Sequence, residues 1–174
     1  MSPILAVIFD LDGTLLDTIV DITAASNRVY EPRGLGVFTD DEMKTLVGDG
    51  AEELIRRVFV MRGKPVPSDA VVTEILDDYR RAYQACWHEH SRPYDGVAEL
   101  LAALAGRSLR TAVLSNKSDI YTTRMTDALL AAHRFDIVRG ARPGVPLKPD
   151  PAPALALAAD LGVPPAACAF VGDT

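Results

Sequence analysis

Apolar residues follow two patterns along this chain, short continuous runs and helical stripes. Residues 4–9 form an apolar, partly β-branched run, which is typical of a strand buried on both faces. Further runs at residues 109–114, 135–138 and 169–171 predict three more strands. Between residues 17 and 91, by contrast, apolar positions recur at helical spacing, which predicts a segment made of helices alone.

Capping residues and helix breakers divide the helical segment into four helices. Asp17 is a suitable cap for the first helix, and Pro32 ends it. The second helix begins near Thr39, and the third has its apolar positions within residues 51–59. Ser68 is a suitable N-cap for the fourth and longest helix.

Helices and strands alternate in the remainder of the chain. The expected helices begin at three acidic residues, Asp95, Asp119 and Asp150. Strands that alternate with helices form parallel sheets covered on both faces. We therefore predict an α/β fold, a doubly wound parallel sheet formed by residues 1–16 and 92–174. Residues 17–91 are predicted to be an inserted α-helical cap over the carboxyl edge of that sheet.

Composition and charge limit the kinds of partner that this protein binds. The 174 residues are 48% hydrophobic and 24% charged, as in an ordinary globular protein. The formal net charge is −6 and the basic residues form no long run, which argues against nucleic acid and membrane surfaces as main partners. A small anionic metabolite is compatible with this charge, because a local basic site can oppose the overall sign.

The cysteines and the N-terminal residues predict a cytoplasmic location. Cys86 and Cys168 both lie among apolar residues and are expected to be small buried thiols, as in proteins of a reducing compartment. No apolar run approaches the length of a membrane span. The N-terminal run has no basic leader and Asp10 interrupts it, so we expect no signal peptide.

Polar residues gather where the predicted strands end. Asp10 and Asp12 follow the first strand, and Gly13 allows the chain to leave it sharply. The carboxyl ends of parallel strands share one edge of a sheet, where such folds bind ligands. That edge is expected to collect the following residues: Asp10, Asp12, Ser115, Asn116, Asp173 and, from the loop before the last helix, Lys148.

The residue types in this set suit phosphoryl transfer. Three carboxylates repel one another unless a cation lies between them, and hard oxygen ligands favour Mg²⁺. A hydroxyl, a backbone N–H group and a lysine ammonium would bind a phosphate. Asp10 could then attack phosphorus once a metal screens its charge. The structural alternative is that Asp10 and Asp12 cap the next turn while Lys148 lies in solvent.

The same residues resemble the motifs of the haloacid dehalogenase-like hydrolases. Residues 9–18 are similar to the first motif, Ser115-Asn116 to the second, Lys148-Pro149 to the third, and residues 171–174 to the beginning of the fourth. The four motifs occur in the order typical of the family and span nearly the whole chain. The resemblance implies a Rossmann-like α/β core and, for the inserted segment, the family's small α-helical cap.

The resemblance also implies a role for each polar residue. Asp10 is the nucleophile that forms an aspartyl-phosphate, and Asp12 is the general acid for the leaving alcohol and then the base for water. The other implied roles are loop orientation beside the phosphate for Thr14, binding of phosphoryl oxygens for Ser115, Asn116 and Lys148, and Mg²⁺ coordination for Asp10, the Asp12 backbone carbonyl and Asp173.

Within this family, the chain is most similar to phosphoglycolate phosphatases. Residues 92–97, 115–118 and 148–153 resemble that group, as does the loop at residues 47–50 in the cap. The implied function is Mg²⁺-dependent hydrolysis of a small phosphorylated metabolite, 2-phosphoglycolate. The first alternative is a phosphatase or phosphomutase that acts on another small ester, such as a sugar phosphate. A dehalogenase is disfavoured, because dehalogenases of this family have no counterpart of Asp12.

The last residue, Thr174, precedes the second acidic residue of the fourth motif. In this family the core continues with a further strand and helices, so we expect the C-terminal part of the core to be missing. A second alternative is therefore an inactive, truncated phosphate-binding module.

Several further polar residues lie outside these motifs. Lys117 is expected to face solvent, with a supporting role at the site as the alternative. Arg56 and Arg57 are expected to form a solvated helix face, with a contact of one of them to the substrate as the alternative. His88 and His90 are two residues apart near a helix end and do not share a face, which disfavours metal binding there.

Overall fold

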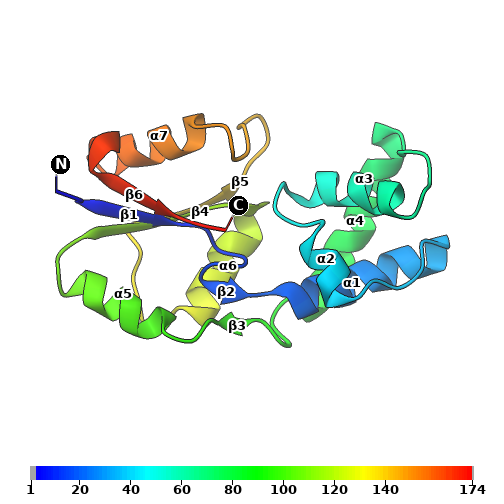
Figure 1. Cartoon of the computed structure of the whole chain (residues 1–174), viewed down its shortest axis with the longest axis horizontal. Helices are drawn as coiled ribbons and strands as arrows, with labels where there is room; N and C mark the ends of the chain where they lie inside the picture. The colour runs from blue at the N-terminus through cyan, green and yellow to red at the C-terminus, as the bar shows by residue number, and fades with distance from the viewer. Residues whose placement is uncertain (1–2, 174) are drawn as a thin grey trace. The chain divides into compact units, whose positions relative to one another are not determined.

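The computed structural model describes residues 3–173 of the chain, which forms two compact units. Unit 1 contains the chain up to Asp17 and from Arg92 onward, and unit 2 is Thr18–Ser91 (Figure 1). Unit 1 thus extends one residue past the predicted boundary at residue 16. The reason is a short antiparallel pairing of β2 (Leu16–Asp17) with β3 (Arg92–Pro93), in which Asp17 lies opposite Arg92.

A four-stranded parallel sheet forms the centre of unit 1. Its strands lie in the order β5-β4-β1-β6. Their bounds are β1 (Ala6–Phe9), β4 (Arg110–Ser118), β5 (Ile137–Ala141) and β6 (Cys168–Val171). The predicted α/β fold with a parallel sheet is confirmed. Strand β4 runs beyond its predicted end at Leu114, and its register against β5 shifts between Leu114 and Ser118.

Helices cover both faces of this sheet. In Figure 1, α7 (Ala152–Asp160) lies on one face, and α5 (Val97–Ala105) and α6 (Asp119–Leu129) lie on the other. Ala6 and Ile8 of β1 pack with Leu157 of α7 in a buried cluster. The helix caps differ from three of the predictions, because Gly96 rather than Asp95 precedes α5, Thr18 rather than Asp17 precedes α1, and Pro151 rather than Asp150 precedes α7. A single turn of 3₁₀ helix, η2 (Pro165–Ala167), precedes β6.

Strand β6 is an edge strand of the described sheet and is only partly covered. Phe170 and Val171 are 44% and 41% exposed. Cys168 at the start of the strand is half-buried, so the prediction of a buried thiol is wrong at this position. Cys86, on the buried stripe of a helix in unit 2, is completely buried as predicted.

Unit 2 is helical throughout, as predicted. Its elements are α1 (Ile19–Tyr30), the 3₁₀ turn η1 (Glu31–Arg33), α2 (Asp40–Lys44), α3 (Ala51–Met61) and α4 (Asp69–Cys86). Thr39 caps α2 in a reciprocal capping box with Glu42, which confirms the predicted start of this helix. Among the described residues, no helix combines the length and apolar composition that crossing a membrane requires.

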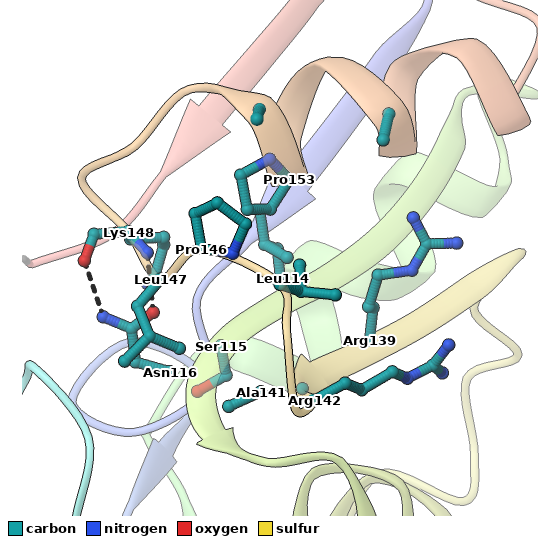
Figure 2. A pocket seen from close by; sticks show the side chains of 14 residues that line it. Leu114, Ser115, Asn116, Arg139, Ala141, Arg142, Pro146, Leu147, Lys148 and Pro153 are labelled. Carbon is teal, nitrogen blue, oxygen red and sulfur yellow. Dashed lines mark hydrogen bonds between the residues drawn. The ribbon is translucent and has the colours of Figure 1, made fainter. Parts of the chain in front are cut away.

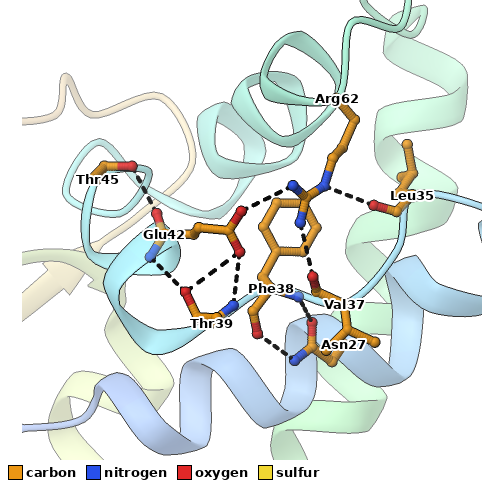
Figure 3. A network of polar contacts seen from close by, with 8 residues as sticks. All are labelled: Asn27, Leu35, Val37, Phe38, Thr39, Glu42, Thr45 and Arg62. Carbon is orange, nitrogen blue, oxygen red and sulfur yellow. Dashed lines mark hydrogen bonds and ion pairs between the residues drawn. The ribbon is translucent and has the colours of Figure 1, made fainter.

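Arg62, just after α3, holds the connection between α1 and α2 in place (Figure 3). Its guanidinium donates to the carbonyl oxygens of Leu35 and Val37, at 3.0 and 2.8 Å, and to the Glu42 carboxylate at 3.0 Å. It also lies 3.9 Å above the centre of the Phe38 ring. The planar guanidinium suits this combination of several acceptors and a ring face.

Asp21 ties together the two ends of unit 2, where the chain enters and leaves this insertion. The completely buried Asp21 carboxylate accepts hydrogen bonds from the backbone N–H groups of His90 and Ser91, at 2.8–3.0 Å, and from the Ser91 hydroxyl at 2.7 Å. Burial by itself would raise the pKa of Asp21, but the hydrogen bonds from Ser91 and His90 outweigh it and lower the pKa.

Asp21→Asn is expected to lower the free energy of unfolding by about 1–3 kcal/mol at about pH 7, because a buried charged acceptor is lost. The folded-state pKa lies below the ordinary value of 3.8, so the carboxylate stabilises the protein above that pH. This contribution disappears as the pH falls through the folded-state pKa. Urea unfolding from about pH 7 to about pH 3 should therefore show the difference between the two proteins shrinking.

The control for this prediction is Asp77→Asn, which removes an exposed ion pair with Arg80 three residues away on the same helix. Exposed pairs contribute about 0–1 kcal/mol, so this variant should unfold almost like the parent. A difference between Asp21→Asn and the parent that stays constant with pH would contradict the assigned role of the carboxylate.

Candidate active site

Asp10 lies directly after β1, at the junction with β6. Its backbone N–H donates to the Val171 carbonyl at 2.9 Å, and its carboxylate oxygen Oδ1 accepts a 2.7 Å hydrogen bond from the Leu11 N–H. Only 4% of the residue is exposed. The end of the buried strand therefore holds the Asp10 carboxylate in one orientation.

Lys148 and Asn116 approach Asp10 from two other elements. The Lys148 ammonium forms an ion pair with the other carboxylate oxygen of Asp10, and both side chains are nearly buried. The Asn116 side chain donates to the Lys148 carbonyl at 2.9 Å and accepts from the Lys148 N–H at 2.8 Å (Figure 2). These two hydrogen bonds hold the loop that carries the ammonium against the end of β4.

The turn after β1 brings Thr14 to Asp173. Gly13 has a φ of +77°, and a Cβ atom at this position would overlap the Asp173 carboxylate. The Thr14 hydroxyl donates to Asp173 Oδ1 at 3.2 Å. Glycine at position 13 thus serves both the sharp turn and the close approach of the carboxylate. Thr174, the last of the residues similar to the beginning of the fourth motif, lies outside the described residues.

Asp12 has a partner that the sequence analysis missed. The Lys117 ammonium lies 3.0 Å from both carboxylate oxygens of Asp12, and only 9% of the lysine side chain is exposed. The expectation that Lys117 faces solvent is wrong, because β4 continues to Ser118 instead of ending at Leu114. A predicted strand that continued to Ser118 would have placed Lys117 on the same face as Ser115, because residues two apart on a strand point to the same side.

The carboxylates at this edge each have a different partner. Asp10 pairs with Lys148, Asp12 with Lys117, and Asp173 accepts from Thr14. Two lysine ammoniums thus compensate two of the three carboxylate charges at this edge. The Asp12 carboxylate is directed to Lys117, which leaves only its backbone carbonyl for the metal role implied by the resemblance.

A pocket of about 310 Å³ opens beside these residues (Figure 2). Its polar side is formed by Ser115, Asn116 and Lys148, and its middle by apolar residues including Leu114 and Pro146. Two arginines line the opposite side, and both have acidic partners, Arg139 with Asp160 at 2.7 Å and Arg142 with Asp119 at 3.0 Å.

The other candidate polar residues lie in unit 2. Arg56 pairs with Asp69 at 2.6 Å, and Arg57 pairs with acidic residues of α3 and the preceding loop, Glu53 and Asp49. Among the described residues, ligand atoms of Asp21, Glu89 and His90 lie within 4.8 Å of one another. The Asp21 oxygens are already used by the hydrogen bonds that close unit 2, so we assign this group a structural role.

Residues 7–174 match the sequence profile of the haloacid dehalogenase-like hydrolases. The chain belongs to this family. The resemblance stated from the four motifs is thereby confirmed. The fold agrees with this assignment. A solved structure from Lactobacillus delbrueckii subsp. bulgaricus, provisionally named a phosphoglycolate phosphatase, superimposes on this chain with a TM-score of 0.90. The two sequences are 26% identical, and the match covers 99% of this chain and 80% of that one.

Two relatives act on different phosphate esters according to their names. The phosphoglycolate phosphatase of Thiobacillus denitrificans is 31% identical over 99% of this chain and 76% of its own length. The N-acetylmuramic acid 6-phosphate phosphatase of Pseudomonas aeruginosa is 32% identical over 97% of this chain and 74% of its own length. The protein is therefore a phosphatase of this hydrolase family that is similar to phosphoglycolate phosphatases.

Asn116→Ala is expected to lower the free energy of unfolding by about 1–3 kcal/mol, because it removes two part-buried hydrogen bonds to the backbone N–H and carbonyl of Lys148. Urea or thermal unfolding measures this loss. Ser118→Ala is the matched control two residues along the same strand, where the exposed side chain makes no capping hydrogen bond to α6. Equal stability of Asn116→Ala and Ser118→Ala would show that the amide does not hold the Lys148 loop.

Proposed function

We propose that this protein is a Mg²⁺-dependent phosphomonoester hydrolase that works through an aspartyl-phosphate on Asp10, with 2-phosphoglycolate as its substrate. The observation that carries this proposal is the setting of Asp10. Its two carboxylate oxygens are oriented separately, one by the Leu11 N–H and the other by the Lys148 ammonium, at the carboxyl end of a buried parallel strand. A carboxylate held in this way is suited to act as a nucleophile.

The proposed reaction has two steps. In the first, an Asp10 oxygen forms a bond to phosphorus while the bond from phosphorus to the alcohol oxygen breaks, and Asp12 gives a proton to that oxygen. In the second, a water molecule attacks the phosphorus of the aspartyl-phosphate and passes a proton to Asp12. Inorganic phosphate leaves, and Asp10 returns to its carboxylate form.

Three residues are suited to hold the transferred group. The Lys148 ammonium next to Asp10 can neutralise phosphoryl oxygens as they approach. The Ser115 hydroxyl accepts from the Lys117 N–H at 3.2 Å and keeps its own proton for a phosphoryl oxygen. The Asn116 backbone is fixed by the two hydrogen bonds of its side chain to Lys148. Thr14 supports this group by holding the turn at Asp173.

The oxygen atoms at the β1 and β6 ends fit a hard divalent cation. The absence of a side chain at Gly13 lets the Asp173 carboxylate lie against the turn that follows Asp10 and Asp12. Asp10, the Asp12 backbone carbonyl and Asp173 would hold Mg²⁺, which would supply neutralisation of charge during phosphoryl transfer.

The second candidate substrate is a sugar phosphate. The relative that acts on N-acetylmuramic acid 6-phosphate is as similar to this chain as the phosphoglycolate phosphatase from Thiobacillus denitrificans. Both candidates require the same residues around Asp10, because they differ only in the alcohol part of the ester. The proposed setting for either reaction is the cytoplasm, where free thiols such as Cys86 and Cys168 persist.

Phosphate release from a panel of esters is the test of this function. We expect 2-phosphoglycolate to give the highest kcat/KM, above N-acetylmuramic acid 6-phosphate and hexose phosphates, and a chelator to abolish turnover until Mg²⁺ is restored. Asp10→Asn should reduce kcat by at least about 10³-fold, because the nucleophile is lost. Asp127→Asn, an exposed acid on α6, is the matched control and should retain activity.

Each alternative has its own outcome in this panel. A sugar phosphate with the highest kcat/KM would replace the substrate but keep the reaction. Transfer of phosphate between sugars without release of free phosphate would indicate a mutase. Binding of phosphate without turnover of any ester would indicate a binding module. Turnover that survives Asp10→Asn would remove Asp10 from its proposed role.

A further inference from the structure

Lys117 and Asp12 form an ion pair between residues 105 positions apart in the sequence. The lysine reaches both oxygens of the carboxylate at 3.0 Å, with 9% of its side chain and 26% of the Asp12 side chain exposed. A donor bound to both oxygens restricts rotation of the carboxylate as well as its position. An exposed surface pair, by contrast, seldom fixes side-chain geometry.

The backbone of Lys117 is held on both sides. Its N–H donates to the Ser115 hydroxyl at 3.2 Å, and its carbonyl accepts from the completely buried Thr122 hydroxyl at 3.1 Å. The adjacent strand comes close here, since a Cβ atom at Gly140 would lie 2.6 Å from the Lys117 carbonyl oxygen. The Lys117 side chain therefore extends from a fixed stretch of backbone rather than from a mobile loop.

An irregularity of β4 lies at this position. The register of β4 against β5 shifts between Leu114 and Ser118, so the ladder is interrupted around Lys117. Such irregularities redirect individual side chains and occur often beside active sites. In this case the side chain directed by the irregular strand is the one that binds Asp12.

We propose that Lys117 is a positioning residue that holds the Asp12 carboxylate in place for the step in which water attacks the phosphorylated Asp10. This inference rests on the proposed function and adds Lys117 to it. Asp12 then needs no rearrangement to accept the proton of the attacking water. Lys117 acts through the Asp12 carboxylate and takes no proton itself.

The test compares Lys117→Met and Lys117→Arg with the parent protein on an aryl phosphate by rapid-mixing kinetics. An aryl alcohol leaves with little need for a proton, so the first step should proceed normally in Lys117→Met. In the fast phase each enzyme molecule releases one aryl alcohol, and the rate of this phase should equal that of the parent. The steady-state rate should fall by about 10²-fold, because proton removal from water is impaired. KM should change by less than about threefold, and Lys117→Arg should recover much of the steady-state rate.

Lys64→Met is the matched control, because it makes the same change at an exposed lysine of unit 2 and should leave both phases unaltered. Equal slowing of the fast and steady-state phases by Lys117→Met would overturn the proposal, as would a steady-state rate like that of the parent. Failure of Lys117→Met and Lys117→Gln to fold, while Lys117→Arg folds, would show a purely structural role and overturn it as well.

Failure of the proposed function gives a different result. In that case the parent protein itself releases phosphate from no ester, and crystal structures of the parent and Lys117→Met decide the positioning claim. An Asp12 side chain that turns away in the variant supports it, and one that keeps its place overturns it.

Discussion

Two lysine–aspartate pairs hold the polar edge of the parallel sheet together. Asp10 with Lys148 and Asp12 with Lys117 place four charges at the end of one strand, and three of the four side chains are at most 10% exposed. Removing one partner of such a pair leaves the other charge uncompensated, which costs about 3–5 kcal/mol in buried settings. The two lysines therefore compensate the charges of two aspartates that lie two residues apart just after β1.

A different structural feature positions each of the two lysines. Lys148 comes from a loop, and the Asn116 amide fixes this loop by bonding to the lysine's own backbone. Lys117 comes from the irregular end of β4 and is held by Thr122 on α6. In both cases a charged side chain is anchored to the packed sheet. The candidate site is therefore as rigid as the core and lacks the mobility typical of loops.

The candidate chemistry and the inserted helices belong to different compact units of the chain. The residues proposed to act on phosphate all belong to unit 1, whereas unit 2 has its own core and is closed at its ends by Asp21. The two relatives named above fit this division, because proteins named for different esters are almost equally similar to this chain. A shared core chemistry with differing alcohol specificity explains this pattern, since specificity depends on a few contacts outside the reacting group.

The sequence alone determined the fold class, the four strands of the sheet and the family, for physical reasons. A strand buried on both faces must be continuously apolar, as Ala6–Phe9 is, and a sharp turn such as that at Gly13 requires glycine. Alternation of helices and strands permits few arrangements other than a parallel sheet, which places the polar residues after each strand at one edge.

Only the tertiary structure decided which charges meet at that edge. The pairing of Lys117 with Asp12 depends on how far β4 continues and where its register shifts, and the placement of Asp17 depends on a partner strand that begins at Arg92. The half-buried state of Cys168 depends on the position of β6 at the edge of the sheet. Such features arise from contacts between distant residues, and a local pattern of apolar and polar positions contains no information about the register that creates them.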